Sequence, residues 1–204
     1  MTRPASGSSR LQLLGRGSSK NVFLEFVGGR PVAAAQPRRD GSEAREALLR
    51  EAALLESLRP SGLFVNVLYA HPGGQFVLTE LAEWGSLLDL ADLLDFECAA
   101  DEFNDLHARA LVYTVLGGLS VLANRGLCHG DLRAQNVLVF EFQPTRLFCK
   151  LSDLEDASVF PRDNMNLFVA GLCDLFPKCA DVFLGSMVFE GAGEACRPQR
   201  TAGL

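Results

Sequence analysis

Short apolar stretches separated by glycines mark the first part of the chain. Residues 11–36 read LQLLGRGSSKNVFLEFVGGRPVAAAQ, so a Gly-rich turn and a Gly-Gly turn separate three stretches of mainly apolar residues. Such stretches bounded by glycine are typical of strands joined by turns. The pattern therefore predicts three strands in succession. Residues 1–10 are rich in Ser, Gly and Pro, and we expect them to form a disordered leader.

The spacing of apolar residues becomes helical between residues 42 and 58. Ser42 is expected to be the N-cap of this helix, and Pro60 follows its end. Glu51 falls in the middle of the apolar face, and a carboxylate in an apolar interface is costly unless it is paired. The pattern therefore predicts a charged partner for Glu51, unless the residue lies at a helix edge in a different fold. At about 100° per residue, that apolar face comprises Ala44, Ala47, Leu48, Ala52, Leu54, Leu55 and Leu58.

Two further strands and at least two helices are expected in the middle of the chain. Residues 63–70 and 75–81 are predicted strands on either side of a His-Pro-Gly-Gly turn. A helix is expected to open at Gly85-Ser86-Leu87, and residues 87–98 are compatible with one helix or two. Residues 103–124 carry a long helical pattern that stops at Asn-Arg-Gly, which is a C-cap signal.

A β-hairpin is predicted next. Residues 137–142 and 147–152 are both rich in apolar, β-branched and aromatic residues, and Gln-Pro-Thr-Arg at 143–146 separates them as a turn. If the strands pair symmetrically about this turn, Asn136 faces Asp153. This register predicts that an amide and a carboxylate lie side by side at the open end of the hairpin.

Oxygen atoms at the open end of the hairpin favour a magnesium site. Asn136 and Asp153 can hold Mg²⁺ while water and phosphate oxygens complete its coordination. Asp131 precedes Asn136 in a predicted loop, where its carboxylate can orient or deprotonate an attacking hydroxyl. The alternative is that these residues only cap turns, as Asp and Asn often do. Their number and spacing around one hairpin favour the catalytic interpretation.

The composition limits the class of protein. The chain has 204 residues, of which 48% are hydrophobic, enough for a core in one large or two small domains. The net charge of −6 gives no global basic field for nucleic acid or an anionic membrane. No apolar run is long enough to span a bilayer, so we expect a cytoplasmic location, although a secretory parent protein is compatible with the sequence. The six cysteines form no CxxC pair, so buried thiols are expected rather than a zinc site.

The hairpin and the loop before it carry a family resemblance. His-Gly-Asp-Leu-x-x-x-Asn at 129–136, followed by strand, turn, strand and Asp, resembles the catalytic loop and metal-binding segment of protein kinases. The resemblance implies that Asp131 is the catalytic Asp and that Asn136 and Asp153 are metal ligands. It also implies that Arg133 stands where kinases usually carry a phosphate-facing Lys. Two departures are Gly130 in place of Arg and Asp-Leu-Glu at 153–155 in place of Asp-Phe-Gly.

The glycine-rich turn resembles the loop that covers the ATP phosphates in protein kinases. Gly15, Gly17 and Val22 match the family pattern, whereas Lys20 occupies the position of the third glycine. This arrangement is similar to that of the with-no-lysine kinases, whose working lysine lies in the glycine-rich loop. The alternative is that Lys20 is an ordinary solvated lysine.

The third strand lacks the lysine that the family usually carries. It reads Val-Ala-Ala-Ala at 32–35 where kinases usually have Val-Ala-x-Lys, so Ala33 matches a nucleotide-lining position and Ala35 replaces the lysine. By resemblance, Glu51 is the helix-C glutamate that pairs with the phosphate-binding lysine. Lys20 is therefore the expected partner of Glu51, with Arg38 and Arg39 as rivals.

The second predicted strand pair leads into a segment that resembles the kinase hinge. The resemblance places Thr79 as the gatekeeper beside the adenine. It also implies that the backbone from Glu80 to Ala82 supplies hydrogen bonds to the adenine.

The resemblance implies an α+β, bilobal protein-kinase-like fold. A small antiparallel β N-lobe would cover residues 11–81, and a mainly helical, truncated C-lobe with the catalytic hairpin would cover 82–176. Residues 177–204 are too short for the usual last helices, so the domain is expected to be incomplete. The interval from Asp153 to Asp163 is also too short for the usual activation loop.

The expected function is ATP-dependent phosphoryl transfer to a protein Ser/Thr hydroxyl, with ATP and Mg²⁺ as cofactors. One alternative is a non-catalytic pseudokinase that acts as a binding or scaffold module, favoured by Ala35, Gly130 and Glu155. Another is a small-molecule kinase, because the catalytic loop with Asp-x-Glu-Asp-Ala at 153–157 is also similar to the aminoglycoside and choline kinases. The expected partners are a nucleotide and a hydroxyl acceptor, and the sequence does not indicate an oligomeric state.

Overall fold

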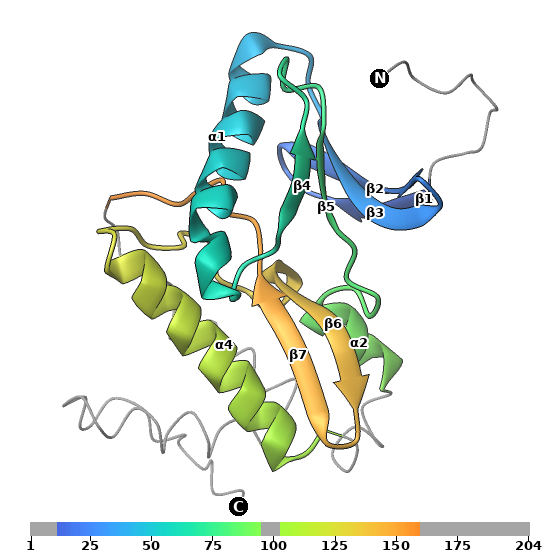
Figure 1. The fold of residues 1–204 in the computed structure, drawn as a ribbon, viewed down its shortest axis with the longest axis vertical. Helices are drawn as coiled ribbons and strands as arrows, with labels where there is room; N and C mark the ends of the chain where they lie inside the picture. The colour runs from blue at the N-terminus through green and yellow to red at the C-terminus, as the bar shows by residue number, and fades with distance from the viewer. Residues whose placement is uncertain (1–11, 95–102, 160–204) are drawn as a thin grey trace, which may run out of the picture.

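The computed structural model describes residues 12–94 and 103–159, which form two lobes (Figure 1). The first lobe is a five-stranded antiparallel sheet with strand order β1-β2-β3-β5-β4, beside which helix α1 lies (Figure 1). The α+β class predicted from the sequence is confirmed. The elements of this lobe are β1 (Gln12–Arg16), β2 (Lys20–Val27), β3 (Arg30–Pro37), α1 (Ser42–Leu58), a 3₁₀ turn (Arg59–Ser61), β4 (Val67–Ala70) and β5 (Val77–Glu80).

The second lobe combines helices with a two-stranded hairpin. Helix α4 packs against β7, and Gly118 makes this close approach possible because a Cβ there would lie 2.5 Å from Leu151 Cδ1. The elements are α2 (Leu87–Leu93), α4 (Asp105–Ala123), a 3₁₀ turn (Ala134–Asn136), β6 (Val137–Gln143) and β7 (Arg146–Leu151).

The three strands predicted at the start of the chain are confirmed. Strands β2 and β3 pair from Lys20 opposite Pro37 to Val27 opposite Arg30. The turn between them needs two glycines, because Gly28 and Gly29 have φ angles of 59° and 79°, which side chains other than glycine rarely adopt.

The predicted strand over residues 63–70 is wrong in its first half. Strand β4 begins only at Val67, because the preceding residues pair with the other lobe. The Val65 N–H donates to the Leu151 carbonyl at 2.9 Å, and the Leu151 N–H donates to the Leu63 carbonyl at 2.8 Å. The segment therefore connects the sheet to the β6–β7 hairpin instead of extending β4.

Helix α1 has the predicted bounds, but its predicted cap is wrong. Gly41 is the N-cap residue and makes no side-chain cap hydrogen bond, while Ser42 is already helical. The apolar face is largely confirmed, because Leu48, Ala52, Leu55 and Leu58 are buried.

Side-chain caps fix the starts of helices α2 and α4. Ser86 caps α2 and exchanges hydrogen bonds with Asp89, as the Gly-Ser-Leu motif predicted. Asn104 caps α4 and exchanges hydrogen bonds with His107. The His107 Nε2 atom lies 2.6 Å from the Gln143 carbonyl oxygen, so the buried histidine joins the helix to the tip of the hairpin.

Helix α4 is also long and apolar enough to cross a membrane by length and composition, because an 18-residue window within its 19 residues has a mean hydropathy of 1.4. This is weak evidence for a span, since half of that window is buried inside the protein. The helix contributes Leu111, Val115 and Leu122 to a core shared by both lobes.

Some expectations fall on residues that the structure does not describe. They are the disordered leader at 1–10, the last part of the helical segment at 87–98, and the segment from 160 to 204, with the end of the C-lobe and the short C-terminal segment.

Candidate active site

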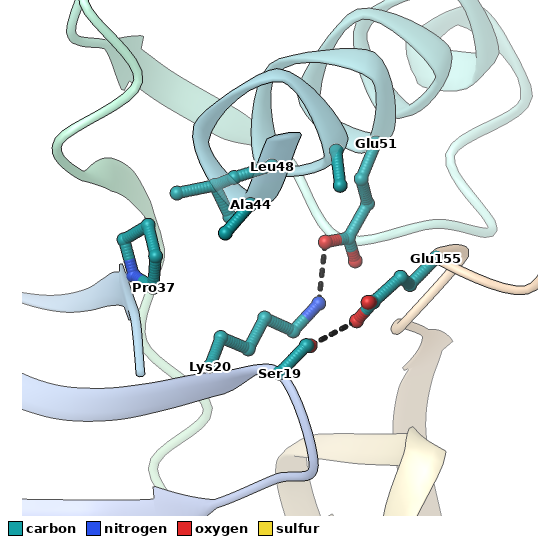
Figure 2. A pocket seen from close by; sticks show the side chains of 8 residues that line it. Ser19, Lys20, Pro37, Ala44, Leu48, Glu51 and Glu155 are labelled. Atoms are coloured by element: carbon teal, nitrogen blue, oxygen red, sulfur yellow. Dashed lines mark hydrogen bonds and ion pairs between the residues drawn. The ribbon is translucent and has the colours of Figure 1, made fainter. Parts of the chain in front are cut away.

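Lys20 forms an ion pair with Glu51. Lys20 is the first residue of β2, and its ammonium donates a hydrogen bond to Glu51 Oε2 on α1 (Figure 2). Both side chains are nearly buried, with exposed fractions of 14% and 8%. The predicted pairing is confirmed, whereas the rival Arg38 points elsewhere and donates to the Gly17 carbonyl at 2.9 Å.

Lys20 also reaches the segment after the hairpin. Its Nζ atom lies 2.8 Å from Asp153 Oδ1. Asp153 has a φ angle of 60°, which is rare outside glycine. The next residue, Leu154, donates its backbone N–H to Glu51 Oε1 at 3.2 Å. The lysine, the helix glutamate and the post-hairpin aspartate therefore form one cluster.

The charges in this cluster support one another. Burial by itself would lower the pKa of Lys20, but the attraction of Glu51 and Asp153 and its hydrogen bonds to both carboxylates raise that pKa above its ordinary value of 10.5. Burial raises the pKa of Glu51, and the attraction of Lys20 offsets part of that rise. Because the pKa of Lys20 is raised, the Lys20 ammonium between the two carboxylates keeps its proton at neutral pH, and the pair is ionic.

A second contact joins the glycine-rich turn to the same segment. The Ser19 hydroxyl donates to Glu155 Oε2, beside the Lys20–Glu51 pair (Figure 2). The four residues border a pocket with about 260 Å³ of empty space that opens to solvent. Sequence reasoning noted Glu155 as a departure from glycine but missed Ser19, because no local pattern pairs residues so far apart. The pocket is also lined by Pro37, Ala44, Ala47 and Leu48.

Asp131 lies in a loop and is held by two neighbours. Its Oδ2 atom lies 3.0 Å from Arg133 Nη2 in an ion pair and accepts a hydrogen bond from Asn136 Nδ2 at 3.1 Å. Asn136 Nδ2 also donates to the Asp131 carbonyl at 2.8 Å. One carboxylate oxygen of Asp131 is thus fixed by the loop, and the side chain keeps an exposed fraction of 32%.

The predicted register of the hairpin is wrong by one residue. A bulge between Val139 and Glu141 shifts the pairing, so Val137 faces Leu151 instead of Ser152. Asn136 is therefore joined to Ser152, whose N–H and hydroxyl donate to its carbonyl at 2.9 and 3.1 Å. Asp153 follows immediately, so the amide and the carboxylate still lie at the same end of the hairpin.

These residues fit a magnesium ion that is shared with a nucleotide. The Asn136 amide nitrogen is used by Asp131, which leaves the amide oxygen as a hard ligand at the same end of the hairpin as Asp153. Among residues 12–94 and 103–159, no group of three or more His, Cys, Asp or Glu side chains is arranged to hold a metal by itself. Oxygen atoms from phosphate and water would have to complete the coordination.

The structure explains the missing arginine of the catalytic loop. Gly130 has a φ angle of 84°, and a Cβ there would lie 2.3 Å from the Asp156 carbonyl oxygen. The backbone N–H of Cys128 donates to the Ser158 carbonyl at 3.1 Å. The chain after Asp153 thus turns back across the catalytic loop and leaves no space for a side chain.

The residues expected to bind nucleotide lie on four adjoining strands, β1, β2, β3 and β5, in the turn between β1 and β2, and in the segment after β5. Gly15 faces Val22 across β1 and β2, and Ala33 faces Thr79 across β3 and β5. Gly17 donates its N–H to the Lys20 carbonyl at 2.9 Å, which shapes the turn.

The expected hinge residues differ in which backbone N–H groups remain available for a hydrogen bond to an adenine. Ala82 accepts from the Gly85 N–H at 3.2 Å, and its own N–H has no hydrogen-bond partner in the described part of the chain. The Glu80 N–H donates to the Asn66 carbonyl at 3.1 Å and is therefore not available to an adenine.

The side chain of Glu80 belongs to a network that sequence reasoning missed. It accepts from the Asn66 N–H at 2.7 Å, from Asn66 Nδ2 at 3.1 Å and from the ammonium of Lys150. Lys150 is buried on β7 and also lies over the rings of Phe140 and Phe148. An ion pair thus connects the end of the first lobe to the β6–β7 hairpin.

Comparison with known families agrees with this geometry. A family model described as protein tyrosine and serine/threonine kinase matches residues 12–163. The match covers most of the chain and includes the glycine-rich turn, α1, the catalytic loop and the hairpin.

Proposed function

Because the chain belongs to the protein tyrosine and serine/threonine kinase family, we propose that it transfers the terminal phosphoryl group of ATP to a Ser/Thr hydroxyl of a protein. The observation that supports activity is the position of Lys20. Although β3 has alanine where the family usually has lysine, the Lys20 ammonium contacts both Glu51 and Asp153.

Each residue of the site has a defined task in this proposal. Asn136 and Asp153 would hold Mg²⁺, which when bound to the nucleotide neutralises charge on the phosphates. Glu51 holds the Lys20 ammonium beside Asp153, so the positive charge is in place before phosphates arrive. Preorganised charges of this kind supply much of the rate in phosphoryl transfer.

Asp131 would orient the acceptor hydroxyl. Arg133 and Asn136 fix one of its carboxylate oxygens, so the other oxygen is the available acceptor for a hydroxyl proton. The exposed guanidinium of Arg133 would also offset phosphate charge at the entrance of the site.

A pseudokinase is the second candidate, favoured by the contact between Ser19 and Glu155. The family usually has glycine at position 155, and here a carboxylate occupies it and bonds the glycine-rich turn. A negative charge under that turn opposes the binding of phosphates, and this is the property expected of a domain that uses its fold without turnover.

Two measurements on one set of proteins test the proposal. Thermal unfolding with ATP, with and without Mg²⁺, should show a Mg²⁺-dependent rise in melting temperature that Asp153→Asn reduces, because a ligand of the folded state stabilises it. Labelled phosphoryl transfer should then be assayed with protein substrates and with hydroxylated small molecules. Transfer to protein that is lost in Asp131→Asn supports the proposal. Binding without transfer to any acceptor supports the pseudokinase, and transfer only to small molecules would reassign the substrate.

A further inference from the structure

Three consecutive residues after the hairpin are each bound to the roof of the site or to helix α1. Asp153 contacts the Lys20 ammonium, the Leu154 N–H donates to Glu51, and Glu155 accepts from the Ser19 hydroxyl. The first two contacts hold groups that the proposed reaction needs. The third joins the tip of the glycine-rich turn directly to the segment beneath it.

The tip of this turn has a fixed shape. Arg38 donates its backbone N–H to the Ser19 carbonyl at 2.7 Å and its guanidinium to the Gly17 carbonyl at 2.9 Å. Because Arg38, the residue that follows β3, binds both carbonyls, the turn is fixed to the end of the sheet on the side where Ser19 meets Glu155.

The charges beneath the turn do not favour a nucleotide in this arrangement. Lys20, Glu51, Asp153 and Glu155 together carry one positive and three negative charges, and Lys20 already contacts two of the carboxylates. The glycine-rich turn is the element that covers phosphates in this family. A serine hydroxyl bonded to a carboxylate leaves no space for a phosphate between the two groups.

We propose that the hydrogen bond between Ser19 and Glu155 is a latch that closes the phosphate site. Mg²⁺·ATP must break this hydrogen bond in order to bind. This inference rests on the proposed nucleotide binding. The latch adds regulation to it, since any event that removes the Ser19 hydroxyl or the Glu155 charge raises the affinity of the same site.

The test measures the affinity of Mg²⁺·ATP by calorimetry for wild type, Ser19→Ala, Glu155→Ala and the double variant. Each single change should lower the Kd roughly threefold to tenfold, since a hydrogen bond to a charged group that must be broken opposes binding. The double variant should gain little beyond Glu155→Ala, because that single change already removes both the contact and the carboxylate charge. Ser18→Ala is the matched control, since this neighbouring serine is exposed and its side chain makes no hydrogen bond within the described residues.

A second readout does not depend on nucleotide. Trypsin cleavage after Arg16, at the start of the turn, should become roughly threefold faster in Ser19→Ala and Glu155→Ala but not in Ser18→Ala, since cleavage follows local opening. If wild type binds nucleotide and neither latch variant binds it more tightly, the latch is wrong and the proposed function stands. If no protein binds nucleotide, the proposed function fails and the latch fails with it.

Discussion

Lys20 Nζ lies 2.8 Å from Asp153 Oδ1, so a residue of the glycine-rich turn contacts the post-hairpin aspartate directly. Lys20 faces Pro37 across β2 and β3, and Val22 faces Ala35. Residues 20 and 22 point to the same side of β2, because side chains alternate along a strand. A lysine at position 20 or at position 35 therefore starts from the same face of the sheet.

This register predicts that a lysine at position 35 can replace Lys20. Lys20→Met should lower phosphoryl transfer by about 10²-fold or more, the scale seen when one preorganised electrostatic contact is removed. Adding Ala35→Lys to Lys20→Met should restore transfer to within about tenfold of wild type. Steady-state kinetics on the three proteins checks both statements.

The matching control separates chemistry from folding. Lys20→Met leaves Glu51 buried without its partner, and such a change typically costs about 3–5 kcal/mol. Lys20→Met with Glu51→Gln removes both charges, so it should recover much of the stability in urea unfolding but none of the transfer. Recovery of transfer in that double variant would contradict the role of Lys20.

Gly130 should tolerate no side chain. Gly130→Ala is expected to lower the free energy of unfolding by about 2 kcal/mol or more, because it combines a strained φ angle with a collision against the Asp156 carbonyl. The control is Gly126→Ala, since Gly126 has a φ angle of 70° but nothing within 4 Å of a Cβ. Gly126→Ala should lower the free energy of unfolding by only about 1 kcal/mol, which is the cost of the positive φ angle alone. Equal losses in denaturant unfolding would show that the collision does not exist.

The ion pair between Glu80 and Lys150 should couple the two lobes. A double-mutant cycle with Glu80→Gln and Lys150→Met is expected to give a coupling energy of about 1–3 kcal/mol, because both groups lie largely out of water and share one network. Glu141 and Arg146 provide the control on the same hairpin. They lie 3.0 Å apart, but Arg146 is 65% exposed, and exposed pairs typically contribute about 0–1 kcal/mol. A coupling energy no larger than that of the control pair would mean that the ion pair between Glu80 and Lys150 does not stabilise the contact between the lobes.

The sequence predicted the parts of the site that local patterns specify. Helical periodicity placed Glu51 on the buried face of α1, and the structure gives it Lys20 as a partner. Strand and turn signals likewise located β1, β2, β3 and the hairpin. In each case neighbouring residues carry the information, so a short window of sequence is enough.

Contacts between distant residues were not predictable in this way. A single bulge near Phe140 moves the hairpin register by one residue. No residue type in the strand indicates that a bulge will form there. The hydrogen bonds of Glu80 to Asn66 and Lys150 were not predicted, and they occupy its N–H and its side chain, while the adenine contact expected of the hinge backbone stays a prediction. The contact of Ser19 with Glu155 is of the same kind, because only the folded chain brings the two residues together.

Cys149 gives a prediction that depends on pH. The thiol lies in the core beside α4, and burial raises its pKa from 9.0 to about 11, partly offset by a hydrogen bond with Thr114. Since the pKa is higher in the folded state, the unfolded chain loses this proton first as pH rises. The contribution to stability is therefore complete below pH 9 and is lost between about pH 9 and 11, by about 2 kcal/mol.

Urea unfolding of wild type and Cys149→Ala over this range should show a smaller decline in the variant. The matched control is Cys128→Ala, which removes a partly exposed thiol instead of the buried one. In folded protein at pH 8, iodoacetamide should likewise leave Cys149 unmodified until urea is added, as peptide mass spectrometry would show. Rapid labelling of Cys149 without urea would place the thiol outside the core and overturn this account of the packing between α4 and β7.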